Sequence, residues 1–336
     1  MPLCKYCGQP VYGEYIVALE ATWHPEHFVC AGCGQPLGKA GYLLGQGKPY
    51  HQACYATYQA PRCAYCHQPV VEAYTQYNGQ PYHTACFREH VVARCIYCQK
   101  PLIGQYLIDV WGDKFCPEHE EQYPHCSFCS RLIPPDQQTP GWREYDSLRC
   151  SVCRYTAVET AEQAQPLFSQ LKQWMGQQGF RFNQLPLSLE LCGRARLGTL
   201  LHARSENHPL GVTLSSTRIQ NGSVLDSRVD GVAVLQGMPA LLFAGVVLHE
   251  LGHVWLTVHG IGNLPLWAEE GFCQLLSHRY YTGLATPEAR YRAESLEQEA
   301  DPIYGDGFRR IRALSERTGF AHFVERLRVT KKLPGA

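Results

Sequence analysis

The chain has 336 residues, of which 45% are hydrophobic and 18% are charged, the composition of a folded protein rather than a disordered one. Lysine plus arginine and aspartate plus glutamate number 30 each, so the chain lacks the strong field that would hold a polyanion or an anionic membrane. This balance argues against nucleic acid and membranes as partners.

Cysteines are concentrated at the start of the chain. Fifteen of the 17 lie in residues 1–153, and only Cys192 and Cys273 lie beyond. Such clustering indicates metal sites in a reducing compartment rather than disulfides. Because Cys4 is already a ligand-type residue, we expect no secretory signal and a cytoplasmic location. The longest apolar run, residues 239–248, is shorter than the ~20 residues that cross a bilayer, which predicts a buried helix.

The clustered cysteines form five copies of one small unit. Each copy has two ligands separated by two residues, followed 16 to 20 residues later by a second such pair. Two pairs of this kind enclose one zinc ion in a tetrahedron of nitrogen and sulfur donors, with no position left for water, so we expect structural sites. The predicted ligand sets are Cys4, Cys7, His24 and His27; Cys30, Cys33, His51 and Cys54; Cys63, Cys66, His83 and Cys86; Cys95, Cys98, Cys116 and His119; and Cys126, Cys129, Cys150 and Cys153.

The first two units resemble a LIM domain. Only Phe28 and Val29 separate them, and "WHPEHFVCAGCGQPL" is similar to the middle of such a domain. His27 and His51 stand where LIM domains usually carry cysteine, and both keep a zinc donor. Units three and four resemble a second LIM domain with a longer joint, and the fifth resembles half of one. We therefore expect a LIM domain at 1–58, a LIM-like domain at 59–122 and a zinc-ribbon-like module at 123–153.

The resemblance to LIM domains implies a docking role. LIM domains mostly bind proteins, although similar zinc ribbons also bind nucleic acid. Residues 1–153 contain 11 lysines and arginines against 13 aspartates and glutamates, so a basic phosphate-binding surface is missing. A protein partner is therefore expected.

Beyond residue 153 the pattern is that of an α+β domain. Residues 165–178 place apolar side chains on one helical stripe, with Pro166 in the first turn and Gly179 at the end. An apolar helix carrying "VVLHELGHVWLTVHG" (246–260) follows three predicted strands, at 185–191, 210–217 and 228–237. We expect residues 154–336 to fold as a domain of their own.

The apolar helix carries an HExxH motif. His249 and His253 share one helix face and can chelate one ion, while Glu250, one step around the helix, faces a water bound to that ion. Unpaired histidines and a glutamate would be costly to bury in this apolar run. Metal binding is therefore favoured over a satisfied core network.

Three residues are candidates for the third metal ligand. His259 stands where metzincins place their third histidine, but Leu256 replaces the glycine that turns their chain. A second helix starting near Trp267, in "LWAEEGFCQLLSHRY", could place a carboxylate against the first. That arrangement is the gluzincin scheme, and gluzincin aminopeptidases have a similar tryptophan, glutamate, glycine sequence. The resemblance implies Glu270 as the ligand, with Glu269 and His259 as alternatives.

Three protein ligands would leave the fourth position of the zinc ion to water, the mark of a catalytic site. Zinc would lower the pKa of that water towards ~7, and Glu250 would accept its proton as the water attacks a carbonyl. The oxyanion needs a further donor. Tyr304, in "YGDGF", is similar to the transition-state tyrosine of gluzincin aminopeptidases, and Tyr280, Tyr281 and His278 compete with it.

The zinc modules, "HELGHVWLTVHGIGNLPLWAEEGFCQLLSHRYY" and "DPIYGDGFRRIRALSERTGFAHFVERLRVTKKLP" together resemble the LIM-containing peptidases typified by a plant organ-size regulator, the DA-one family. The resemblance spans nearly the whole chain. It implies a gluzincin-like zinc endopeptidase that cleaves selected regulatory proteins, with one catalytic and five structural zinc ions, His249 and His253 as ligands of the catalytic one, and Glu250 as the catalytic glutamate.

One property of the plant proteins is not carried over, and two other functions stay open. Plant members bear ubiquitin-binding helices before the LIM region, but Cys4 is already a ligand here, so no ubiquitin dependence is expected. The chain could instead be a LIM-type interaction protein with a degenerate peptidase domain. It could also be a protease acting on DNA-associated proteins, since some of these pair HExxH with a zinc ribbon, although the missing basic patch speaks against this.

Overall fold

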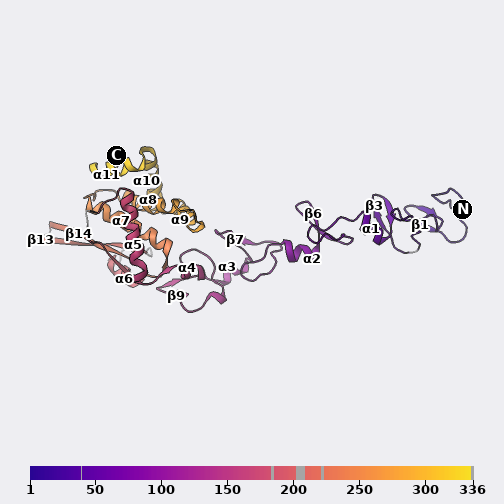
Figure 1. Cartoon of the computed structure of the whole chain (residues 1–336), viewed down its shortest axis with the longest axis horizontal. Helices are drawn as coiled ribbons and strands as arrows, with labels where there is room; N and C mark the ends of the chain where they lie inside the picture. The colour runs from indigo at the N-terminus through magenta and orange to yellow at the C-terminus, as the bar shows by residue number, and fades with distance from the viewer. Residues whose placement is uncertain (39, 183–184, 202–208, 221–222, 334–336) are drawn as a thin grey trace. The chain divides into compact units, whose positions relative to one another are not determined.

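The computed structural model describes residues 1–38, 40–182, 185–201, 209–220 and 223–333 (Figure 1). The chain divides into two compact units, residues 1–107 with 114–116 and residues 108–113 with 117–336. Zinc-type modules come first and an α+β region follows, so the predicted multidomain class is confirmed.

The first unit is a series of short hairpins with little core. Each hairpin of three or four residues per strand ends in a tight turn, such as Asn78 and Gly79 with φ of 47° and 74°, the positive values that two-residue hairpin turns require. A small apolar cluster around Phe28 and Tyr50 is enclosed. The elements are β1 (Ile16–Ala18), β2 (Ala21–Trp23), β3 (Leu43–Gly45), β4 (Lys48–Tyr50), α1 (Gln52–Tyr58), β5 (Tyr74–Tyr77), β6 (Gln80–His83), α2 (Thr84–Cys86) and a π-helical turn (Phe87–Val91); β7 (Leu107–Ile108) and β8 (Lys114–Phe115) follow.

The second unit is built around a three-stranded sheet and a bundle of helices. The strand order is β12-β14-β13, with β12 parallel and β13 antiparallel to β14, so β13 is an edge strand. The strands are β12 (Ser188–Cys192), β13 (Gly211–Gln220) and β14 (Ser223–Leu235). The later helices are α7 (Ala240–Val258), α8 (Leu266–Thr282), α9 (Pro287–Gln298), α10 (Gly305–Thr318) and α11 (Phe320–Thr330), and α6 (Arg194–Leu200) lies between β12 and β13.

Helix α7 lies at the centre of this unit. It continues beyond the apolar run 239–248 through the HExxH motif, and Val247, Leu251 and Trp255 are buried along it. By length and composition α7 could cross a membrane, with a mean hydropathy of 1.6, but 61% of the stretch tested is buried, and an ordinary core helix meets the same criteria.

Helix α5 (Ala161–Gln177) begins earlier than the sequence pattern predicts. Thr160 and Gln163 form a capping box that starts the helix at Ala161, so Pro166 lies inside the helix and the prediction that it occupies the first turn is wrong. The reciprocal cap satisfies two of the free N–H groups at the helix start, which favours this earlier boundary. The predicted apolar stripe is retained, with Phe168 and Met175 buried.

The fifth zinc module shares the core of the second unit. It comprises α3 (Glu118–Gln122), a short 3-10 turn (Pro135–Gln137), β9 (Arg143–Glu144), β10 (Ser147–Leu148) and α4 (Ser151–Tyr155). Its Phe128 and Ile133 belong to the same apolar cluster as Phe168 and Leu251. Strand β11 (Ala157–Val158) continues the chain by pairing with β15 (Met238–Pro239) beside the start of α7. A fragment starting at residue 154 would therefore lose part of its core.

Arg149 joins this module to the rest of the unit. Its side chain is 1% exposed, and its guanidinium donates to the Gly141 carbonyl at 2.7 Å, to Glu159 at 2.6 Å and to the Gly237 carbonyl at 3.4 Å. A charge so far from water is tolerated because its N–H groups are paired. The side chain thereby connects residues distant in sequence.

Replacing Arg149 should therefore destabilise the second unit. Arg149→Met leaves buried carbonyls unpaired, and we expect a loss of about 2–4 kcal/mol in the free energy of unfolding, measured by urea denaturation of the full chain. The matched control is Arg328→Met, which breaks an ion pair whose partners are 46% and 59% exposed and should cost about 0–1 kcal/mol. Equal effects of the two substitutions would contradict the role assigned to Arg149.

Candidate metal centre

The structure brings together the five predicted ligand sets of the zinc modules. In each set the four ligand atoms lie within 4.8 Å of one another. The 17 cysteines are all free thiols rather than disulfides. Each set offers four sulfur or nitrogen donors, the composition of a closed structural zinc site.

Backbone N–H groups stabilise the thiolate form of the first cysteine in several modules. The N–H of His24 donates to the Cys4 sulfur at 3.4 Å, and that of His51 to the Cys30 sulfur at 3.3 Å. Burial by itself would raise the pKa of these thiols, but the N–H groups outweigh it and lower the pKa of Cys4 to about 5 and of Cys30 to about 6. The thiolate is the form that binds zinc, so these residues fit the ion.

A sixth cluster forms where α7 and α8 pack together. His249 Nε2 lies 3.1 Å from Glu270 Oε2 and 3.2 Å from His253 Nε2, and His253 Nε2 lies 3.5 Å from Glu270 Oε2. Ligands about 2.0–2.1 Å from a tetrahedral zinc ion are separated by about 3.3 Å. The three atoms therefore have the spacing of one face of a zinc coordination tetrahedron.

The three candidates for the third ligand lie in different places. Burial alone would raise the pKa of Glu270, but His249 and His253 outweigh it and lower that pKa to about 2, so the carboxylate is ionised as a metal ligand must be. Glu269 instead contacts the other nitrogen of His253, Nδ1, at 3.0 Å. His259 turns back to the Trp255 carbonyl of its own helix, at 3.0 Å.

The contact of Glu269 with His253 adds a role that the sequence reasoning missed. Histidines that bind metals commonly donate their second N–H to a carboxylate, which fixes the tautomer and the orientation of the ring. Glu269 is placed for this because it lies in the first turn of α8, directly before Glu270. The paired glutamates of "LWAEEGF" were the available signal, but only the helix packing shows which oxygen meets which nitrogen.

Small residues allow the helices to approach closely enough for this cluster. A Cβ at Gly252, inside the motif, would lie 2.8 Å from the Cys273 sulfur on α8. A Cβ at Gly245 would overlap the Tyr281 hydroxyl, and one at Gly271 would overlap the backbone of Gly307 on α10. These contacts bring Glu270 to the histidines and α10 to α8.

The four candidate oxyanion donors have different neighbours in the structure. Tyr304 lines the cavity beside His249, with ring centroids 6.5 Å apart. His278 donates to the Glu297 carboxylate at 2.7 Å, and the Tyr280 ring packs against Trp174. Tyr281 also lines the cavity but is buried.

Tyr304 is held at the start of α10 and keeps its proton. Asp301 Oδ1 accepts the backbone N–H groups of Ile303 and Tyr304 at 2.7 Å and 2.9 Å. Burial first, and then the charge of Glu270, raise the pKa of the Tyr304 phenol. A protonated phenol beside His249 is a hydrogen-bond donor, as the predicted role requires.

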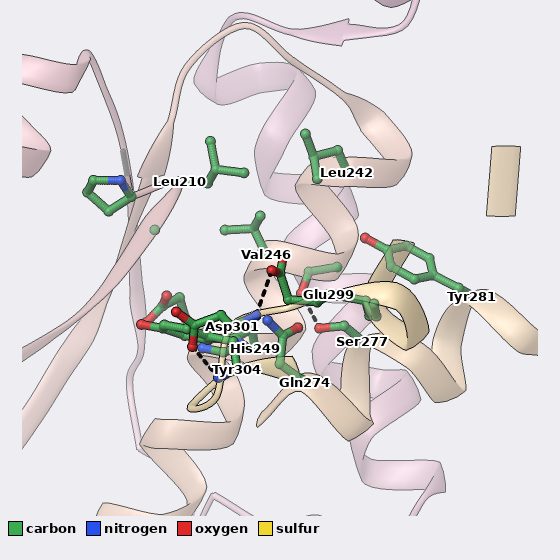
Figure 2. Close-up of a pocket in the computed structure, with 15 residues that line it drawn as sticks. Leu210, Leu242, Val246, His249, Gln274, Ser277, Tyr281, Glu299, Asp301 and Tyr304 are labelled. Carbon is green, nitrogen blue, oxygen red and sulfur yellow. Dashed lines mark hydrogen bonds between the residues drawn. The ribbon is translucent and has the colours of Figure 1, made fainter. Parts of the chain in front are cut away.

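A cavity of about 480 Å³ opens onto the centre, and His249, Glu250 and Tyr304 line it. Figure 2 shows an apolar wall with Leu242 and Val246 on one side, and Glu299 and Asp301 on the loop before α10. The volume lies within the range of about 300–1,000 Å³ typical of ligand pockets. The cavity is therefore large enough to admit a ligand side chain next to the motif.

The fold and the clusters define the class: a multidomain protein with LIM-type zinc modules followed by an α+β region that carries a histidine–glutamate centre. Comparison with protein families agrees, because residues 4–59 match the LIM domain and residues 203–286 match the DA1-like family described as "Protein DA1".

Curated relatives extend this agreement over the whole chain. "Protein DA1" of Arabidopsis thaliana is 23% identical over 393 residues, covering 99% of this chain and 68% of its own. "LIM domain-containing protein HDR3" of Oryza sativa subsp. japonica is 23% identical and covers 99% and 74%, and "Protein DA1-related 2" of Arabidopsis thaliana is 25% identical and covers 99% and 70%. The chain thus combines a LIM domain with a DA1-like domain and is homologous to the DA1 family, as its sequence motifs predicted.

Metal analysis tests the proposed ligands. We expect six zinc ions per chain, one for each of the five modules and one for the α7–α8 centre, measured by elemental analysis of protein purified without added metal. Glu270→Ala should reduce the content to five, because a ligand is lost. Glu269→Ala should keep six ions, since its contact is with Nδ1 of His253 rather than with the ligand nitrogen.

Two outcomes would contradict these assignments. Four or fewer ions in folded wild-type protein would mean that the repeat has been misinterpreted. Six ions in Glu270→Ala together with five in His259→Ala would replace Glu270 by the metzincin-type ligand. A mild chelator should remove the ion of the α7–α8 centre first, because that centre offers three protein ligands and each zinc module offers four.

Proposed function

We propose that this protein is a zinc-dependent endopeptidase of the DA1 type that cleaves selected protein substrates. The observation that carries the proposal is the triangle of His249, His253 and Glu270 at 3.1 to 3.5 Å, with Glu250 lining the cavity beside His249. Three ligands together with a neighbouring carboxylate constitute the arrangement of a hydrolytic metal site.

Each residue of the centre has a separate task in this proposal. When bound, zinc would supply Lewis-acid polarisation of the peptide carbonyl and a water of lowered pKa. Glu250 takes the proton of the attacking water and returns it to the leaving amine. Tyr304 donates its phenolic hydrogen to the oxygen that becomes negative. Glu269 orients His253 through Nδ1.

The zinc modules of the first unit are proposed to dock substrates or a partner protein. Their surface exposes apolar side chains, among them Tyr6, Tyr12 and Tyr58 at 62% to 71%, and aromatic residues of this kind are enriched at protein interfaces. We propose neither nucleic acid nor membranes as partners. Reduced zinc-thiolate sites favour the cytoplasm as the location.

Replacing the proposed base tests the enzymatic function. Glu250→Gln should abolish hydrolysis and keep six zinc ions, because the amide preserves the shape but cannot accept the proton. New protein N-termini produced in a cell lysate by the wild-type and Glu250→Gln proteins are compared by mass spectrometry, and sites seen only with the wild type identify the substrates. Identical profiles would favour an interaction protein with a degenerate peptidase domain.

The docking role predicts how the first unit affects the rate. Because the ligands of the fourth module, Cys95, Cys98, Cys116 and His119, span the boundary of the two units, the appropriate truncation removes residues 1–92 and keeps that module whole. We expect this truncation to slow cleavage of a protein substrate at least tenfold and to change hydrolysis of a short unstructured peptide less than twofold. Equal rates on the protein substrate would exclude docking, and a large gain on the peptide would indicate that the modules cover the site instead.

A further inference from the structure

A hydroxyl from the edge strand β13 contacts the proposed catalytic base. Thr213 Oγ1 donates to Glu250 Oε2 at 2.9 Å and lies 3.1 Å from the main-chain carbonyl oxygen of Glu250. Within helix α7 that carbonyl also accepts a helical hydrogen bond, whereas the carboxylate is a charged and therefore stronger acceptor. Thr213 therefore donates its hydroxyl hydrogen to the Glu250 carboxylate rather than to the main-chain carbonyl.

A glycine two residues earlier lets the strand come this close. Gly211 and Thr213 lie on the same face of β13, since side chains alternate along a strand. A Cβ at Gly211 would lie 2.7 Å from Val246 Cγ1 and 3.0 Å from Glu250 Oε1. Gly211 thus leaves room for the glutamate, and Thr213 holds it from the same strand.

The two carboxylate oxygens of Glu250 are not equivalent in this arrangement. Oε2 accepts from Thr213, and Oε1 accepts no hydrogen bond from any residue that the structure describes. Glu250 and Gly211 line the cavity, while Thr213 is outside its lining. Thr213 can therefore influence chemistry in the cavity only through Glu250.

We propose that Thr213 is a positioning residue. Its hydrogen bond holds Glu250 Oε2, so that Glu250 Oε1 faces the water that Glu250 deprotonates. The proposal rests on the function proposed above. A glutamate side chain has three rotatable bonds, and fixing one oxygen removes the rotamers in which the other points away from the centre. Thr213 thus orients Glu250 as Glu269 orients His253. Strand β13 and helices α7 and α8, which carry these residues, meet at one centre.

Substitutions of Thr213 in the full-length protein test this role. Thr213→Val keeps the shape but lacks the donor, and we expect kcat on fluorescein-labelled casein to fall about tenfold to a hundredfold with KM and zinc content unchanged, the usual effect of losing such a supporting bond. Thr213→Ser restores a hydroxyl and should recover most of the rate. Thr318→Val is the matched control, because the Thr318 hydroxyl donates only to a helix carbonyl, that of Leu314 at 3.0 Å.

A second measurement does not depend on activity. In crystal structures, Glu250 should occupy one conformation in the wild type and in Thr213→Ser, and more than one in Thr213→Val. An unchanged kcat in Thr213→Val, or a Glu250 carboxylate in the wild-type position in that variant, would overturn the proposal. If the wild-type protein hydrolyses neither casein nor any lysate protein, the proposed function fails, while the crystal structures still decide whether Thr213 positions Glu250.

Discussion

The close packing of α7 against α8 is the constraint on which the proposed centre depends. Histidine and carboxylate groups largely removed from water are costly unless each has a partner. The His249 and His253 side chains are 15% and 17% exposed, and their partners come from the facing helix. Gly245 and Gly252 on α7 face Tyr281 and Cys273 on α8, so larger residues at the glycines would separate the helices. With that separation Glu270 could no longer reach the two histidines, and their burial would be unfavourable.

Further close contacts of this kind position the other groups of the centre. Gly271 follows Glu270 and meets Gly307 of α10, so the ligand helix also fixes the helix that starts beside Tyr304. On the other side, Gly211 allows β13 to lie against Glu250. Three close backbone approaches thus bring the proposed ligand, donor and base to one centre, although these groups are far apart in sequence.

The zinc-type modules have different surroundings in the two units. In the first unit the apolar clusters are small, and small domains of this kind usually need metals or disulfides to be stable. The fifth module is instead covered by the core of the second unit. Helix α9 extends this connection, because Arg292 donates to the Phe128 carbonyl of the module at 2.6 Å while Leu296, further along the same helix, lines the cavity.

Local patterns in the sequence were sufficient for features that depend on spacing. Ligands separated by two residues form a knuckle in nearly any context, so the five sets could be predicted before their atoms were seen together. Likewise, a four-residue spacing on a helix places two histidines on one face whatever packs around it, and the resemblance to the DA1 family followed from motifs that are contiguous in the chain.

Tertiary structure alone decided the features that depend on how elements meet. The sequence left Glu270, Glu269 and His259 open because each can be near the motif in some packing of the helices, and it indicated nothing about Thr213, 37 residues before Glu250. The start of α5 was also mispredicted, since the Thr160 cap outweighed the preference of Pro166 for a first turn. Side-chain contacts across elements depend on small residues at crossing points, and no local pattern specifies which glycine faces which neighbour.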